Sequence, residues 1–125
     1  MGFLRKIFTW WDGATIGAGM HIRSAGREVG RDHLGNTYYL SKKGDRRWVI
    51  YNGEAEASRI PAAWHGWMHK RTDIPPTQDN YKPHPWEKPH VPNLTGTPGT
   101  YRPRGSILTS EKRQEVTGDY EPWTP

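Results

Sequence analysis

Proline and glycine set the strongest limit on what this chain can fold into. Eleven Pro and fourteen Gly make one residue in five of the 125 a breaker of regular structure. Proline removes a backbone donor and clashes inside a helix, and glycine loses much conformational entropy there. Helical bundles and long uninterrupted elements are therefore excluded. Ten of the eleven prolines lie at or beyond Pro75, so the chain has two physically different parts.

Residues that build hydrophobic cores are scarce. Leu, Ile, Val and Phe together number 18, whereas Trp alone numbers seven. Such a low aliphatic content is typical of disordered chains, but the tryptophans argue against simple disorder. The composition supports at most one small domain and does not favour a large buried enzyme pocket.

The chain contains no cysteine, which excludes disulfide scaffolds, thiol nucleophiles, cysteine-ligated zinc and iron–sulfur clusters. No apolar run approaches the ~20 residues that span a bilayer, and the N-terminus lacks the pattern of a secretory signal. We therefore expect a protein on the cytosolic side of a membrane. The formal net charge is +5, and its excess of cations falls in residues 1–71, which hold twelve Lys or Arg and six Asp or Glu.

The N-terminus has the pattern of a short amphipathic helix. Apolar residues recur at helical spacing from Phe3 to Trp11, with two cations among them, and Asp12 and Gly13 end the pattern. We predict a helix over residues 1–12. Because a helix of this length is marginal alone in water, its apolar face should pack on the domain, on a partner or at a lipid interface.

Short strands and tight turns follow. Residues 26–32, 37–41 and 47–51 are separated by corners that carry the Asn, Gly and Asp favoured in hairpin turns. The pattern predicts a three-stranded antiparallel meander. Trp48 and Ile50 point to one face of the last strand and their neighbours to the other, so we expect a covering element on each face.

A helix over residues 60–69 is predicted to cover the sheet, with Trp64 and Trp67 on its inner face. His65 and His69 have the spacing at which a helix offers two imidazoles to zinc. No glutamate adjoins them and no third ligand is evident, so we interpret them as local hydrogen-bonding groups or as partner contacts. The residues assigned to the structural core are Trp48, Ile50, Trp64 and Trp67.

Residues 72–125 are predicted to form an extended arm. Only six Ile, Leu or Val occur there, too little apolar surface to offset the entropy of ordering the segment. Aromatic rings occur at intervals among the prolines, and such rings can dock into successive pockets of a larger surface. A disordered linker is the alternative. The residues predicted to contact a partner are His65, His69, Trp86, Tyr101 and Trp123.

No enzyme is expected, and no catalytic, cofactor-binding or metal-binding residue is assigned. The glycines near the N-terminus form no phosphate-binding fingerprint, no nucleophile elbow is present, and the carboxylates are scattered singly. The basic first part leaves open an RNA-binding or ribosome-associated module. The arm has one acidic residue more than it has cations, which argues against nucleic acid as its partner. A metal-dependent enzyme using the histidine pairs is the third alternative.

Four motifs follow one another along the chain: Val29–Tyr39, Arg47–Tyr51, Pro61–His69 and Thr72–Pro76. Together they closely resemble the seventeen-kilodalton accessory subunit family of respiratory complex I (NADH:ubiquinone oxidoreductase), in its alphaproteobacterial type. Asn93–Pro98 and Tyr101 also resemble that family's C-terminal arm.

This resemblance implies a non-catalytic accessory (supernumerary) subunit, without a cofactor of its own, that stabilises the peripheral arm of complex I by clamping neighbouring subunits. The implied partners are the quinone-module iron–sulfur subunits and a small zinc-binding accessory subunit, with no nucleic acid and only indirect or peripheral membrane contact. The implied location is the cytoplasmic face of the bacterial inner membrane, or the matrix face in a mitochondrion. A related branch of the family acts as an assembly factor, which remains an alternative.

The expected fold class is α+β, a small antiparallel β-meander with short helices followed by a long, extended, Pro-rich C-terminal arm. The predicted domains are an N-terminal amphipathic helix (1–12), a small sheet-and-helix domain (13–71) and a partner-binding arm (72–125).

Overall fold

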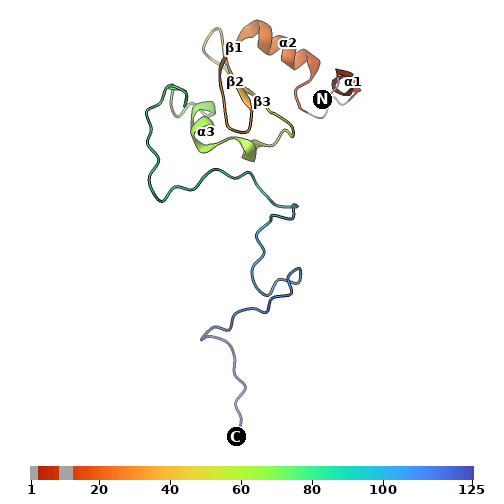
Figure 1. Ribbon diagram of the computed structural model, residues 1–125, viewed down its shortest axis with the longest axis vertical. Helices are drawn as coiled ribbons and strands as arrows, with labels where there is room; N and C mark the ends of the chain where they lie inside the picture. The colour runs from red at the N-terminus through yellow and green to blue at the C-terminus, as the bar shows by residue number, and fades with distance from the viewer. Residues whose placement is uncertain (1–2, 9–12) are drawn as a thin grey trace. The chain divides into compact units, whose positions relative to one another are not determined.

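The computed structural model describes residues 3–8 and 13–125. The chain forms two compact units, Met1–Asn93 and Leu94–Pro125. Every helix and strand of the described residues lies in the first unit (Figure 1). In chain order these elements are α1 (Phe3–Phe8), α2 (Ile16–Ala25), β1 (Gly26–Arg31), β2 (Thr37–Ser41), β3 (Arg47–Ile50), the 3₁₀ helix η1 (Ala57–Arg59) and α3 (Ala62–Met68).

Helix α1 lies within the helix predicted over residues 1–12. The rest of that prediction, residues 1–2 and 9–12, lies outside the described residues. Leu4, Ile7 and Phe8 of α1 are exposed, so these three side chains leave apolar surface uncovered by the rest of the chain.

The three strands form an antiparallel meander in the order β1-β2-β3. The two connecting turns place Gly35 and Gly44 at φ values of 83° and 79°, a conformation that residues with a Cβ rarely adopt. A bulge between Glu28 and Gly30 interrupts the register of β1 with β2. The α+β class and the meander expected from the turn residues are thus confirmed.

The hydrophobic core lies between the sheet and α3. Tyr38, Trp64 and Trp67 are almost completely buried. The rings of Tyr38 and Trp64 stack with their centroids 3.9 Å apart, and Trp67 meets Trp64 edge-on, both of which are favourable aromatic geometries. Gly30 lets β1 approach this stack closely, since a Cβ there would lie 3.1 Å from the Trp64 ring. The partly buried residues around the core are Val29, Leu40, Val49, Ile60 and Met68.

Helix α2 lies on another side of the sheet from α3 (Figure 1). Thr15 caps its N-terminus by accepting a hydrogen bond from the Ala18 N–H, as a threonine cap does. His21 meets the Trp48 ring edge-on at 5.9 Å, and Ile22 is the buried residue of the helix. No prediction of a helix was made for these residues, because two glycines and a weak apolar pattern obscure it.

A buried polar network holds the turn between β1 and β2. The carboxylate of Asp32 accepts four hydrogen bonds, from the Leu34 and Asn36 N–H groups, the Asn36 amide and the Tyr38 hydroxyl, at 2.8–3.0 Å. The Asn36 amide also donates to the Arg59 carbonyl, which ties the turn to η1. Burial alone would raise the pKa of the Asp32 carboxyl, but the bonds from Asn36 and Tyr38 outweigh it and lower that pKa.

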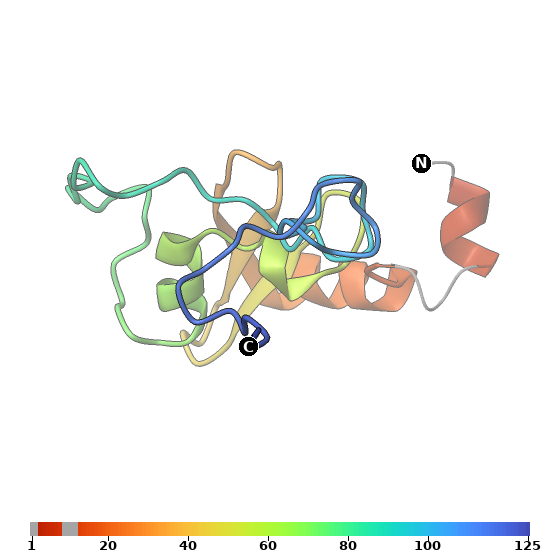
Figure 2. The ribbon, with the colours of Figure 1, turned by 90° about the horizontal axis from the view of Figure 1, so that it is seen from below.

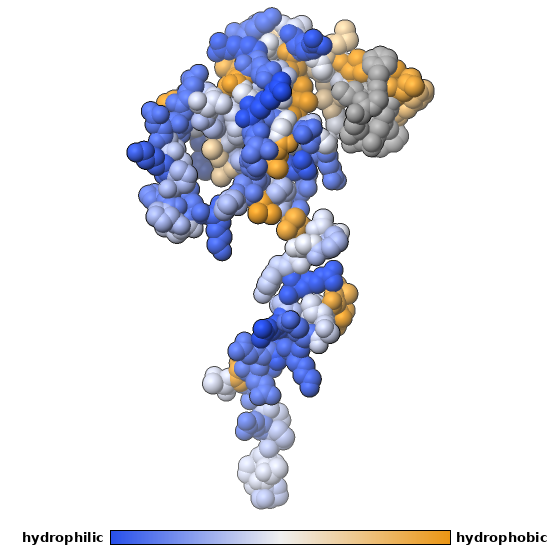
Figure 3. Space-filling model, viewed as in Figure 1, coloured by the Kyte–Doolittle hydropathy of each residue, from blue (hydrophilic) through white to orange (hydrophobic). Residues whose placement is uncertain are grey.

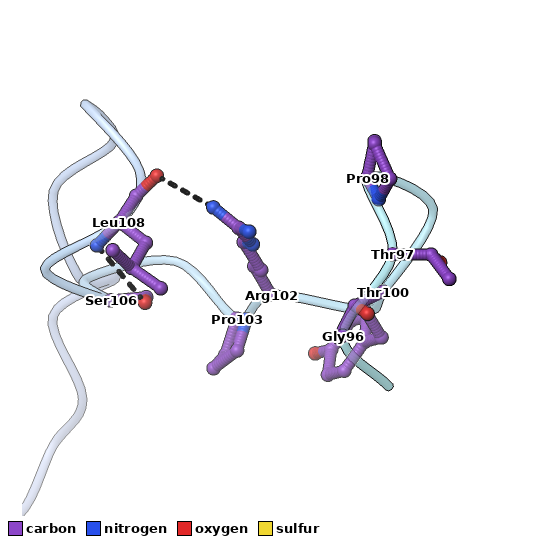
Figure 4. Close-up of a pocket in the computed structure, with 9 residues that line it drawn as sticks. Gly96, Thr97, Pro98, Thr100, Arg102, Pro103, Ser106 and Leu108 are labelled. Carbon is purple, nitrogen blue, oxygen red and sulfur yellow. Dashed lines mark hydrogen bonds between the residues drawn. The ribbon is translucent and has the colours of Figure 1, made fainter. Parts of the chain in front are cut away.

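The second unit is a succession of turns without a helix or a strand. Backbone bonds close several of these turns, including those from Thr97 N–H to the Leu94 carbonyl and from Thr109 N–H to the Ser106 carbonyl. One stretch surrounds an open recess of about 770 Å³, across which Arg102 donates to the Leu108 carbonyl (Figure 4). Strongly hydrophobic residues appear in this unit as separate small patches (Figure 3).

Candidate protein-binding site

Arg47 holds the chain where it leaves α3. Its side chain is only 7% exposed, and it points from β3 toward the C-terminal end of α3. The guanidinium group donates to the carbonyls of Trp67 and Thr72 and to the Asp73 carboxylate. It also lies 4.8 Å from the centroid of the Trp67 ring, within cation–π range. The direction in which the following segment leaves the domain is therefore set by a buried cation.

Sequence reasoning did not single out Arg47 among the 18 Lys and Arg residues. The sequence did contain an indication that Arg47 is buried. Arg47 shares a strand face with Val49 and pairs with Leu40, and both of these residues pack at the core. A charge at an inward position of a strand indicates a buried partner set.

The segment after α3 returns along the first unit. Pro75 is buried, and the Thr77 methyl lies against Gly30 of β1. Further on, the Asn93 N–H donates to the Ser58 hydroxyl at 3.0 Å. The boundary between the two units thus falls after Asn93, and the predicted start of the arm at Thr72 lies inside the first unit. Which part of 72–125 binds a partner stays a prediction.

The predicted aromatic contacts are strongly exposed. Trp86, Tyr101 and Trp123 are 76%, 85% and 82% exposed. Trp86 is held in place by a parallel stack with His84, at 5.3 Å between centroids. Nearby, Tyr81 donates its hydroxyl to Glu87, and this bond raises the pKa of the Tyr81 hydroxyl. An ordered, exposed indole loses little entropy on binding, which is the property of a binding hot spot.

His65 and His69 lie together at the end of α3, with ring centroids 4.2 Å apart, and both are exposed. In the part of the chain that the structure describes, no three His, Cys, Asp or Glu side chains are grouped so that they could hold a metal ion. The pair is therefore placed at the surface, and its predicted contact with a partner stays a prediction.

The four residues assigned to the core lie on two faces of the sheet. Trp64 and Trp67 are buried in the α3 layer. Trp48 and Ile50 are half-buried and share the opposite face with Tyr39, the cross-strand partner of Trp48. The structure therefore brings the first two together and separates them from the second two.

An open groove of about 720 Å³ lies between α2 and this second face of the sheet. Ile16 and Met20 line it from α2, where they are 37% and 67% exposed, and Tyr39 and Ile50 line it from the sheet. Sequence reasoning missed this surface because it missed the helix. Among the described residues no helix combines the length and apolar character needed to cross a bilayer.

The small sheet, the short flanking helices and the chain of exposed aromatic side chains place this protein among small α+β proteins with a long, turn-rich C-terminal segment. Residues 26–125 match the family model described as NADH ubiquinone oxidoreductase subunit NDUFA12. The chain belongs to this family, as the resemblance of its motifs indicated.

Several relatives agree with the family assignment. NADH dehydrogenase [ubiquinone] 1 alpha subcomplex subunit 12 of Bos taurus is 40% identical over 104 residues, covering 72% of this chain and 70% of that protein. An uncharacterised protein of Rickettsia prowazekii (strain Madrid E) is 33% identical over 67 residues, covering 49% and 65%, which fits the alphaproteobacterial type. The mouse NADH dehydrogenase [ubiquinone] 1 alpha subcomplex assembly factor 2 is 29% identical over 89 residues, covering 57% and 51%.

Proposed function

We propose that this chain is a non-catalytic accessory subunit of respiratory complex I, which stabilises the peripheral arm by clamping neighbouring subunits together. The family match over residues 26–125 supports membership of the enzyme. The observation that carries the clamping role is the set of exposed aromatic side chains between Trp86 and Trp123, which have no core of their own to pack into.

The clamp has two parts in this proposal. The first unit is a rigid support, because the stacked Tyr38 and Trp64 rings and the buried Arg47 hold its sheet, α3 and the outgoing chain together. The exposed aromatic side chains then reach a second protein surface, where large flat rings supply contact area at low entropic cost. The proposed partners are the quinone-module iron–sulfur subunits and a small zinc-binding accessory subunit.

The proposed location is the cytoplasmic face of the bacterial inner membrane, or the matrix face in a mitochondrion, with peripheral or indirect membrane contact. The family, which is named for a subunit of the NADH ubiquinone oxidoreductase, supports an association with that enzyme. Membranes solubilised in mild detergent and separated by size should show the chain together with NADH dehydrogenase activity. Finding the chain only as a free monomer would refute the proposal.

The clamping role has its own test. Trp86→Ala should weaken retention in the solubilised complex by about 30-fold or more, as expected for an aromatic hot spot. The unfolding free energy of the isolated chain should change by less than about 0.5 kcal/mol, because the indole is exposed. Retention equal to wild type for Trp86→Ala, Tyr101→Ala and Trp123→Ala alike would refute the aromatic clamp.

An assembly factor is the second candidate, and the mouse relative of that name supports it. An assembly factor associates with incomplete enzyme and leaves before maturation. The two candidates therefore differ in the particle that contains the chain. Pulse-labelled chain that stays with the fully active particle after a chase supports a permanent subunit, whereas chain confined to smaller, inactive particles supports the assembly factor.

A further inference from the structure

Three segments that are distant in sequence bring cations to one end of the first unit. The turn between β2 and β3 meets the end of α2, where the Lys42 ammonium donates to the Ser24 carbonyl at 2.6 Å. The chain after α3 reaches the same turn, where the Lys70 ammonium donates to the Asp45 carbonyl at 2.7 Å. The six cations that these three segments carry, which we term the basic end, are Arg23, Lys42, Lys43, Arg46, Lys70 and Arg71.

The basic end concentrates the charge of the whole protein. Its six cations are all exposed, and Asp45 is the one carboxylate in residues 22–25, 41–46 and 70–71. Asp73, which follows, pairs with Arg47. The resulting formal charge of +5 equals the net charge of the entire chain, so the remaining residues are neutral in sum. None of the six forms an ion pair with another residue that the structure describes. Like charges gathered in this way repel one another in the isolated chain.

Helix dipoles do not account for the basic end. A cation is favoured in or just after the last turn of a helix, which explains Arg23 at the end of α2 and Lys70 after α3. Lys42 also has a structural role, because it donates to the Ser24 carbonyl. Lys43 and Arg46 are left without a side-chain hydrogen bond or an ion pair to another described residue. Lys42, Lys43 and Arg46 also border a recess of about 410 Å³, together with one carboxylate, Asp45. The half-buried Trp48 contributes an apolar wall to this recess.

We propose that the basic end docks against an acidic segment of a neighbouring subunit, with a carboxylate side chain of that segment entering the recess beside Trp48. This inference rests on the proposed function as a subunit and specifies one of its contacts. With three cations and Asp45 at its border, the recess keeps a formal charge of +2 beside the indole wall. It is therefore complementary to a projecting Asp or Glu, whose carboxylate and short apolar stem match both features.

A protein partner accounts for the basic end better than nucleic acid or lipid does. Single-stranded RNA binding uses a succession of exposed rings on which bases stack. The recess offers only two rings, Trp48 and His21, which pack edge-on against each other. An anionic bilayer attracts cations without requiring a shaped recess. A recess with fixed cations at its border instead matches a single projecting side chain.

The test uses the full chain in its membranes. In Lys43→Glu/Arg46→Glu two exposed cations of the basic end are reversed, and neither side chain makes a hydrogen bond to another described residue. The matched control, Arg27→Glu/Arg31→Glu, has the same net charge but changes two exposed arginines of β1, outside the basic end and outside residues 72–125. Arg31 makes only an exposed pair with Glu28, which contributes little to stability. Membranes carrying each version are washed at graded ionic strength, and the chain remaining with NADH dehydrogenase activity is measured.

We expect reversal at the basic end to weaken retention about 100-fold at physiological salt, since close charge pairs at an interface each contribute tenfold or more. The control should follow wild type, and wild type should dissociate more readily as salt screens the contact. Unchanged thermal unfolding of the reversed variant shows that it folds. Identical salt profiles for all three versions would overturn the inference and leave the proposed function intact, whereas wild type absent from the enzyme would overturn the proposed function itself.

Two parallel measurements separate the partner classes. Purified chain is mixed with protein-free vesicles of phosphatidylglycerol and, separately, with single-stranded RNA. One result would be that wild type binds one of these probes and that Lys43→Glu/Arg46→Glu abolishes this binding without changing retention on the enzyme. That result would overturn a protein partner in favour of lipid or RNA. If Lys43→Glu/Arg46→Glu loses retention on the enzyme, and wild type binds neither vesicles nor RNA, the result supports an acidic protein segment as the partner.

Discussion

The Tyr38 hydroxyl offers a direct measure of the polar network beneath the β1–β2 turn. Tyr38→Phe removes one hydroxyl and keeps the ring stacked on Trp64. The lost hydrogen bond is 2.8 Å long, is made to the Asp32 carboxylate, and lies in a residue with 0% exposure. Hydrogen bonds to charged groups contribute about 1.5–3 kcal/mol, so we expect a loss of about 2 kcal/mol, or roughly 30-fold in the unfolding constant.

The pH dependence identifies the cause of this loss. The folded-state pKa of Asp32 is lowered, so the stability linked to its carboxylate is present above the unfolded pKa of about 3.9 and is lost as pH falls through the folded pKa. Tyr38→Phe removes part of what lowers this pKa. The difference in unfolding free energy between the variant and wild type should therefore be largest near pH 7 and shrink toward pH 3.

Urea unfolding followed by tryptophan fluorescence measures both quantities, since Trp64 and Trp67 are in the core. Tyr39→Phe is the matched control, because it makes the same chemical change on the neighbouring residue, which faces away from the core. It should alter stability by less than about 0.5 kcal/mol. A destabilisation by Tyr38→Phe that is the same at pH 7 and pH 3 would refute the reasoning, because its source would then not be the ionised carboxylate.

Three further outcomes follow from packing. Gly30→Ala should destabilise the chain by about 1–3 kcal/mol, because its Cβ would meet the Trp64 ring. Gly66→Ala in α3 has open space around the new Cβ and should stabilise the chain by about 0.5–1 kcal/mol. Urea unfolding measures both changes. Arg47→Met should speed proteolysis of the segment after α3, seen by mass spectrometry, while unchanged cleavage would show that Arg47 does not hold it. Residues 94–125 should be cut first in the isolated chain and be protected in the complex; equal cleavage in both states would argue against a bound arm.

Local chemistry made the meander predictable. The turn residues between the strands specify conformations that glycine adopts readily, and Gly35 and Gly44 have the positive φ that such turns require. Alternation along β3 likewise placed Trp48 and Val49 on opposite faces, as the structure shows. These features depend on neighbours a few residues away, so the sequence alone is sufficient to read them.

Helix α2, and the separation of the predicted core residues onto two faces of the sheet, could not be predicted from local sequence in this way. Two glycines lower the helix propensity of α2, and its side-chain contact to Trp48 comes from a strand more than twenty residues later. Strand phase separates Trp48 from Val49 but does not say which face α3 covers. That choice depends on the fit of Trp64 and Trp67 against Tyr38, a contact between distant segments.

The sequence by itself determined a small β-meander followed by a chain unable to form its own core. The features that showed this were the distribution of prolines, the residues of the turns and the alternation along the strands. The tertiary structure alone decided that Arg47 is buried as a support for the outgoing chain and that three distant segments bring their cations to one end. The physical reason is that the burial of a side chain, and the electrostatic field at a surface, depend on which distant segments the fold brings together. A cation looks the same in the sequence whether it is solvated, buried or part of a charged surface.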